Sequence, residues 1–251
     1  GIECSYVISN AGDCSFPEAW PGYNVCTSYD RCYWFRVPTT FEDGKLKWSL
    51  NAEYDVVYFA FWAPYSHERH LDLIGRCVVS NRAQTKSLGK TLDGRDLDLV
   101  TFGTGKLKVW AVARQHPGES MAEWWMEGFI NRLLDTADAQ VRKLLEEATV
   151  YLVPNMNPDG SVRGHLRTNA CGANLNREWT TTGSYEAPTL ERSPEVYYVL
   201  QELDAVGCDM FIDVHGDEGL PHNFLAGMEG IPKWGPRLES LQATFTDRLV
   251  E

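Results

Sequence analysis

The sequence has no apolar run of the about 18 residues that a membrane span requires, and it is poor in basic residues. Lysine and arginine together number 23 against 35 aspartates and glutamates, which gives a formal net charge of −12. A chain with this charge repels nucleic acid and anionic membrane surfaces, and no basic stripe reverses the charge locally. We therefore expect neither nucleic acid nor a membrane among the partners of this protein.

The sequence also lacks the cysteine pattern of a disulfide framework. The seven cysteines are an odd number, and no two of them form a C-x-x-C pair. Small secreted domains that depend on disulfides carry denser, even-numbered cysteines. We expect the thiols to be reduced and the protein to be cytoplasmic.

The sequence does contain enough apolar material for a large core. Hydrophobic residues make up 43% and charged residues 23% of the 251 positions, as in soluble globular proteins of one large or two ordinary domains. The chain begins without Met and ends inside a predicted helix, 236–251, that has no stop signal. We expect it to be an internal piece of a longer protein, truncated at both ends.

Two regions differ in their hydrophobic pattern, and the first is typical of β-structure. Residues 1–82 carry short aromatic and β-branched runs, such as 54–61, and Asp43-Gly44 lies between two runs as a hairpin turn does. Only residues 66–79 have helical spacing. We predict that residues 1–82 form part of a small, all-β, sandwich-like domain.

From about residue 86 the pattern changes to strand, loop and helix. Strands that alternate with helices build a mostly parallel or mixed sheet with helices on both faces, so we predict an α/β domain over residues 83–251. The predicted strands are 97–102, 107–113, 149–153 and 209–214, and the predicted helices are 119–134, 139–147 and 194–205.

Two histidines and a glutamate follow predicted strands in a pattern that suits zinc. His116 follows the strand 107–113, and Glu119 lies three residues further on across a Pro-Gly turn. His215 stands at the carboxyl end of the strand 209–214. If the two strands are neighbours, these groups converge outside the carboxyl ends of the sheet. Two histidines and one glutamate leave a fourth position open, as in catalytic zinc sites.

This spacing does not decide between a metal site and ordinary structure. A histidine at the end of a strand is more often a hydrogen-bonded surface or core residue, and His-x-x-Glu has many chance matches. The segment between the candidate ligands is more specific. It carries Asn-Pro-Asp-Gly at 157–160, Asn-Arg-Glu-Trp at 176–179 and Ser-Pro-Glu at 193–195.

These motifs, together with His-Pro-Gly-Glu at 116–119 and in this order, resemble the M14 zinc carboxypeptidases over about residues 86–251. The runs 28–38 and 61–66 resemble the β-domain of the cytosolic carboxypeptidase branch. The run 155–169 is most similar to bacterial members of that branch. The resemblance implies that residues 83–251 are the N-terminal part of the catalytic domain.

The resemblance also implies a function and roles for six residues. The function is hydrolysis of the C-terminal residue of peptides or proteins by a zinc-dependent metallocarboxypeptidase. The resemblance makes His116, Glu119 and His215 the zinc ligands, Arg167 the stabiliser of the oxyanion, and Asn176 and Arg177 the pair that holds the terminal carboxylate of the substrate. Arginine suits a carboxylate because its planar fork binds both oxygens.

The sequence departs from the family at one position and stops before another. Asn174 stands where many members have an aspartate that orients a zinc-bound histidine, so either Asn174 or a carboxylate such as Asp213 or Asp217 has that task here. The family's general base is a glutamate well downstream of the last histidine ligand. We expect it beyond this chain, and we expect the chain alone to be inactive or nearly so.

Two other functions remain open from the sequence. A zinc amidohydrolase of the aspartoacylase type shares His-x-x-Glu and a distant histidine, and would cleave an acylated amino acid. A non-catalytic module that binds zinc or a peptide is the alternative outside enzymes. Arg163 is open too, since it is either a solvated charge or a residue of the cleft. Side-chain specificity and oligomeric state do not follow from the sequence.

Overall fold

The structure, a computed structural model, describes residues 1–181, 186–220 and 222–250. It divides into two compact units, Gly1–Gly216 and Asp217–Glu251. The second unit contains α6 (Pro236–Val250), which confirms the predicted helix. Inside that unit, Gln242 accepts a hydrogen bond from the Met228 backbone N–H and donates one to Glu229.

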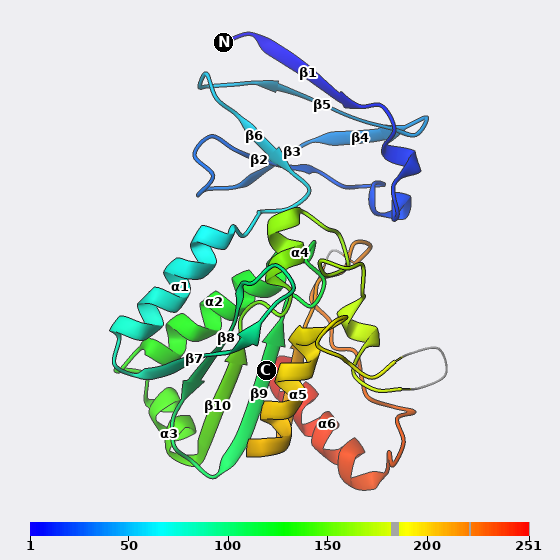
Figure 1. Cartoon of the computed structure of the whole chain (residues 1–251). Helices are drawn as coiled ribbons and strands as arrows, with labels where there is room; N and C mark the ends of the chain where they lie inside the picture. Colours follow the sequence, from blue (N-terminus) through cyan, green and yellow to red (C-terminus); the bar gives the residue numbers. More distant parts are fainter. Residues whose placement is uncertain (182–185, 221, 251) are drawn as a thin grey trace. The chain divides into compact units, whose positions relative to one another are not determined.

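The first unit opens with two three-stranded antiparallel sheets (Figure 1). One has the order β1-β5-β4 and the other the order β3-β2-β6. Their bounds are β1 Glu3–Ile8, β2 Val25–Ser28, β3 Phe35–Val37, β4 Thr39–Glu42, β5 Lys45–Asn51 and β6 Tyr58–Ala60, with short 3₁₀ turns at Ala11–Asp13 and Pro17–Ala19.

Apolar side chains from both small sheets form one core, which confirms the predicted β-rich region. Val25 and Val37 from one sheet pack with Leu46 and Trp48 from the other. The β4–β5 hairpin turns at Asp43-Gly44 with φ of 51° and 71°, the left-handed values that a tight hairpin turn requires. The strand in the aromatic run 54–61 is shorter than the run, because only Tyr58–Ala60 pairs with β2.

A five-stranded mixed sheet with the order β11-β9-β10-β8-β7 follows. Strand β9 pairs in parallel with β10 and β11, whereas β8 pairs antiparallel with β10 and β7. This confirms the α/β prediction in its mixed form. The strands are β7 Ala83–Lys90, β8 Asp96–Phe102, β9 Leu107–Ala113, β10 Ala148–Val153 and β11 Met210–Val214.

Helices cover both faces of this sheet (Figure 1). Alternate residues of each strand point to opposite faces, so β9 sends Ala111 and Ala113 toward α1, α2 and α3, and sends Trp110 and Val112 toward α5. The helices are α1 His67–Val79, α2 Ser120–Leu134, α3 Ala139–Glu147, α4 Pro158–Arg163 and α5 Pro194–Val206, with a 3₁₀ turn at Leu175–Arg177.

The carboxyl ends of β9 and β11 lie side by side. Ala113 is the register partner of Val214, and the backbone N–H of Arg114 donates to the Val214 carbonyl at 3.4 Å. The two strands are therefore neighbours, as the convergence of the candidate ligands requires.

All seven cysteines are free thiols, and no helix in the described ranges is long and apolar enough to cross a membrane.

Candidate metal centre

His116, Glu119 and His215 form one compact cluster at these strand ends. Each offers a ligand atom, and the three atoms lie within 4.8 Å of one another. Nδ1 of His116 is 2.7 Å from one carboxylate oxygen of Glu119, and Nδ1 of His215 is 2.9 Å from the other. The backbone N–H of Gly216 also donates to Glu119 at 2.9 Å. The chain thus brings together the three ligands that the sequence predicts.

The outer nitrogen of each histidine has its own acceptor. Nε2 of His116 lies 3.1 Å from Oδ1 of Asn174, and Nε2 of His215 lies 2.8 Å from Oδ2 of Asp213. When such a ring is neutral, its single proton on Nε2 leaves the Nδ1 lone pair directed at the centre of the cluster. Two of the three residues that the sequence left open as histidine partners, Asn174 and Asp213, therefore contact one ring each. Asp217 instead accepts from the backbone of Gly219 and Leu220.

This donor set fits Zn²⁺. Two imidazole nitrogens and a carboxylate are the ligands of many catalytic zinc sites, and ligand histidines in such sites commonly donate their second N–H to an amide or carboxylate. His116 and Glu119 are each only 3% exposed, so neither of these two side chains can turn freely into solvent. The arrangement matches a preformed metal site rather than a chance surface cluster.

The charges of the cluster are strongly coupled. Burial alone would raise the pKa of Glu119, but hydrogen bonds from His116 and His215 outweigh it and lower the pKa to about 2. Burial would lower the pKa of His215, but Asp213 and Glu119 on either side raise it to about 10. Glu119 is therefore ionised at neutral pH, as a metal ligand must be.

The turn between His116 and Glu119 is held by its neighbours. Gly118 donates its N–H to the Leu166 carbonyl at 2.9 Å, and a Cβ at Gly118 would lie 2.8 Å from that oxygen. Arg114 has φ of 59° and donates from Nε to the Pro117 carbonyl at 2.9 Å. Glycine is required at position 118 because the loop that carries Leu166 approaches the turn so closely.

Arg167 is the next residue along that loop, so its backbone is placed beside the metal-ligand turn. Its side chain is half-buried and makes no hydrogen bond or ion pair with any residue of the described ranges. The structure thus places the backbone of Arg167 near the ligand turn and leaves its guanidinium without a partner among the described residues. Arg163, by contrast, is committed to Asp93, with Nη2 at 2.6 Å from Oδ1.

Asn176 and Arg177 lie in the 3₁₀ turn that begins at Asn174. Oδ1 of Asn174 accepts from the Asn176 backbone N–H at 3.1 Å, so the same oxygen contacts this turn and His116. Nδ2 of Asn176 is 3.5 Å from Nε2 of His215. Arg177 donates from Nη1 to the Asn176 carbonyl at 2.8 Å. Both predicted substrate-binding residues therefore come from a turn that contacts the candidate metal ligands.

The sequence reasoning missed Gln115, which is fully buried and contacts Asp213 and Trp179. The signal was available, because a polar residue between an apolar strand and a ligand histidine has to find buried partners.

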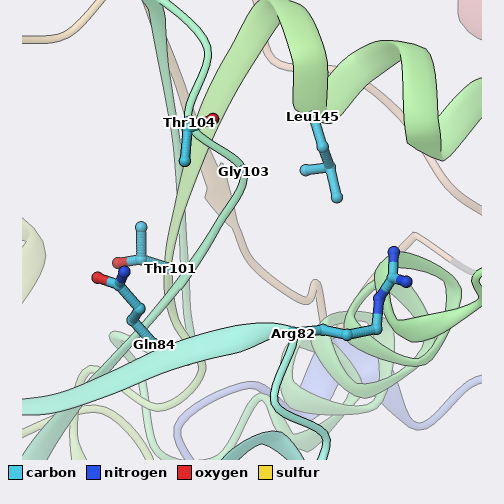
Figure 2. Close-up of a pocket in the computed structure, with 6 residues that line it drawn as sticks. All are labelled: Arg82, Gln84, Thr101, Gly103, Thr104 and Leu145. Atoms are coloured by element: carbon cyan, nitrogen blue, oxygen red, sulfur yellow. The ribbon is translucent and has the colours of Figure 1, made fainter.

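A separate pocket of about 270 Å³ lies elsewhere and contains none of the candidate site residues (Figure 2). It is lined by Arg82, Gln84, Thr101, Gly103, Thr104 and Leu145.

Comparison with known families gives two matches. Residues 1–62 match the model of the cytosolic carboxypeptidase N-terminal domain, and residues 78–220 match the model of the zinc carboxypeptidases. A protein of Zymomonas mobilis is 48% identical over 98% of this chain, which spans 63% of that protein. Human cytosolic carboxypeptidase 4 is 30% identical over 193 residues, with 69% of this chain and 17% of that protein covered.

Two solved structures are close to the whole chain. The metallo-carboxypeptidase from Burkholderia cenocepacia is 47% identical with a TM-score of 0.92, over 98% of this chain and 66% of that one. The metallo-carboxypeptidase from Pseudomonas aeruginosa, solved with (2-guanidinoethylmercapto)succinic acid, is 45% identical with a TM-score of 0.92, over 99% of this chain and 66% of that one. The chain thus spans less than two thirds of the length of the Zymomonas protein and about two thirds of each of these structures.

Proposed function

The chain belongs to the M14 zinc carboxypeptidase family, and from that premise we propose that it carries the zinc site of a metallocarboxypeptidase that hydrolyses the C-terminal residue of peptides or proteins. The supporting observation is the His116–Glu119–His215 triad, whose ligand atoms lie within 4.8 Å of one another at adjacent strand ends. Because the chain spans 63% of its Zymomonas relative, the activity is proposed for the whole protein.

His116 and His215 would hold the metal through Nδ1, and Glu119 through its carboxylate. Bound Zn²⁺ would supply Lewis acidity to the scissile carbonyl and to an attacking water. The protein's own contribution is the fixed geometry of the ligands. Asn174 and Asp213 hold the outer nitrogens of the two rings, at 3.1 and 2.8 Å.

The remaining roles fall to residues beside the triad. Arg167 would donate to the oxyanion of the tetrahedral intermediate, since its guanidinium is not engaged by any described residue. Asn176 and Arg177 would bind the terminal carboxylate of the substrate, which makes the enzyme an exopeptidase. Their turn shares the Asn174 oxygen with His116, so substrate recognition and metal binding are built on the same local structure. A cytoplasmic location and the domain division at residue 82 stay predictions.

The test compares peptides with a free C-terminus and the same peptides blocked as amides, using the full-length protein. We expect zinc-dependent release of the C-terminal residue from the free peptides alone. Arg177→Ala should lower that activity by about 1.5–3 kcal/mol of transition-state stabilisation, the size of a hydrogen bond to a charged group. Arg142→Ala, at an exposed arginine of α3, is the matched control.

Other outcomes of this assay point to other functions. Equal cleavage of free and amidated peptides would contradict the exopeptidase proposal. Hydrolysis of N-acyl amino acids without peptide cleavage would indicate the amidohydrolase. Zinc and peptide binding without turnover of either substrate by the full-length protein would indicate a binding module.

A further inference from the structure

A hydrogen-bond chain behind His215 joins three segments that are far apart in the sequence. The side chain of Gln115 is fully buried and donates from Nε2 to Oδ2 of Asp213. Its Oε1 accepts from the indole Nε1 of Trp179 at 2.9 Å. The same Asp213 oxygen accepts from Nε2 of His215 at 2.8 Å. These hydrogen bonds therefore connect Trp179 through Gln115 and Asp213 to His215, a candidate metal ligand.

The direction of each hydrogen bond follows from the donors and acceptors. An indole N–H can only donate, so the carbonyl oxygen of Gln115 must face Trp179 and its NH₂ must face Asp213. An ionised carboxylate can only accept, so His215 donates to it from Nε2. In the neutral ring that binds a metal, the single proton is then on Nε2, and the lone pair of Nδ1 faces Glu119. The amide of Gln115 thus helps to set which nitrogen of His215 is available as a ligand.

Gln115 is important because few other groups hydrogen-bond to the carboxylate of Asp213. Its second oxygen, Oδ1, is buried and has no partner in the described part of the chain. Both hydrogen bonds that hold the carboxylate therefore meet at Oδ2, one from the ligand His215 and one from Gln115. If the Gln115 amide is removed, the hydrogen bond from His215 is the one that remains on Asp213 among the described residues. Asp213 would then no longer be held independently of the histidine that it orients.

The other ligand histidine is arranged differently. His116 has the neutral amide of Asn174 behind it, so Asp213 supplies the carboxylate behind the pair of histidines. We infer that Gln115 is a positioning residue of the metal centre, which holds Asp213 against His215 and thereby raises the affinity of the site for zinc. The inference rests on the proposed zinc site. It assigns a role to a residue outside the ligand set and outside the substrate-binding turn.

The test is zinc affinity measured by competition with a chromophoric chelator, for the wild type, Gln115→Leu, Asp213→Asn and the double variant. Loss of a residue that supports a metal-ligating histidine typically lowers the metal affinity about 10–100-fold. We expect Gln115→Leu to lower the zinc affinity by a factor near the lower end of that range. Gln201→Leu, at an exposed glutamine of α5, is the matched control and should bind zinc as the wild type does. Melting curves of the metal-free proteins show whether each variant is folded.

Two readouts separate positioning from a general structural effect. If Gln115 acts through Asp213, Gln115→Leu should add little to the loss caused by Asp213→Asn. The visible absorption of the Co²⁺-substituted protein should also shift in Gln115→Leu, because the geometry of His215 has changed. Unchanged affinity and an unchanged Co²⁺ spectrum in Gln115→Leu would overturn the role of Gln115, and so would fully additive losses. A wild-type protein that binds no zinc would instead overturn the metal site itself.

Discussion

At the scale of single residues, the two histidines of the triad differ in the charge behind them. His116 donates to the neutral amide of Asn174, whereas His215 donates to the carboxylate of Asp213. A carboxylate partner raises the basicity of a ligand imidazole, and such partners change metal affinity about 10–100-fold. The site therefore has one ring with strong electrostatic support and one ring without it.

This asymmetry predicts that Asn174→Asp tightens zinc binding. The new carboxylate keeps an oxygen for Nε2 of His116 and for the Asn176 backbone N–H, so the local geometry is preserved. We expect about a tenfold gain in zinc affinity at pH 7, measured by chelator competition. Weaker or equal binding by the variant would show that the neutral amide does not limit the affinity of this site.

Glu195 is a second residue whose environment predicts a measurable effect. Its side chain is fully buried, Oε2 accepts from Asn169 at 3.3 Å, and Oε1 has no partner among the described residues. Burial raises the pKa of Glu195 to about 7 from an ordinary 4.5. Because the folded state holds this proton more tightly than the unfolded state, its contribution to stability falls as pH rises from about 4.5 to about 7.

Glu195→Gln should therefore flatten the dependence of stability on pH in that window. Between pH 5 and pH 8, we expect the free energy of unfolding of the variant to rise relative to that of the wild type. The rise should be at most roughly 3 kcal/mol, at 1.36 kcal/mol per pKa unit. Urea unfolding at both pH values measures the difference, with Glu146→Gln on α3 as the control. A difference between variant and wild type that does not change with pH would mean that Glu195 titrates normally.

At the scale of elements, the loop from His116 to Glu119 depends on the close approach of another loop. A Cβ at Gly118 would lie 2.8 Å from the Leu166 carbonyl oxygen, which is closer than such atoms come in practice. Gly118→Ala should push these loops apart, with a cost of about 1–3 kcal/mol in the free energy of unfolding and weaker zinc binding. Gly128→Ala is the control, because nothing lies within 4 Å of a Cβ there.

Gly128 is exposed in the middle of α2, so alanine at that position should be neutral or stabilise the protein by about 0.5–1 kcal/mol. Chemical denaturation and chelator competition on the two variants give the comparison. If Gly118→Ala retained full stability and zinc affinity, the close contact with Leu166 would not constrain the ligand turn.

The elements also show what the sequence could and could not predict. Strands β9 and β11 were predicted because their sequences are mostly apolar runs, and they place His116 and His215 next to each other. Strand β7 was missed because its residues, Ala83–Lys90, are mostly polar and lie at the edge of the sheet. Hydrophobic periodicity carries no signal for a strand that buries so little.

The site follows the same division. The ligand types and their order could be predicted from local motifs, and the triad confirms that they meet. The partner of each ring could not, because the choice between Asn174 and Asp213 depends on how a 3₁₀ turn and a strand end approach two different histidines. The partners of Gln115 could not be predicted for the same reason, since Asp213 and Trp179 lie far away along the chain.

At the scale of the whole molecule, the segment that leaves the small β-sheets is joined to the metal-ligand turn. Trp62 donates from Nε1 to the Gly118 carbonyl at 2.6 Å. The next residue, Ala63, accepts from Ser120 Oγ at 2.7 Å and from Trp124 Nε1 at 3.1 Å. The ligand turn is therefore fixed from one side by the Leu166 loop and from the other by residues that follow β6.

This contact predicts that the β-region contributes to metal binding although it supplies no ligand. Trp62→Phe keeps most of the ring but removes the N–H that holds the Gly118 carbonyl, which should cost about 0.5–1.5 kcal/mol of stability and speed the dissociation of zinc. Trp34→Phe is the control, because Trp34 also donates to a backbone carbonyl, that of Arg31, but through a solvent-exposed hydrogen bond of the β-region. Stopped-flow transfer of zinc to a chelator gives the rates. A Trp62→Phe protein that releases zinc as slowly as Trp34→Phe and the wild type would show that the ligand turn keeps its geometry without this contact, and that the link between the β-region and the metal centre is structural only.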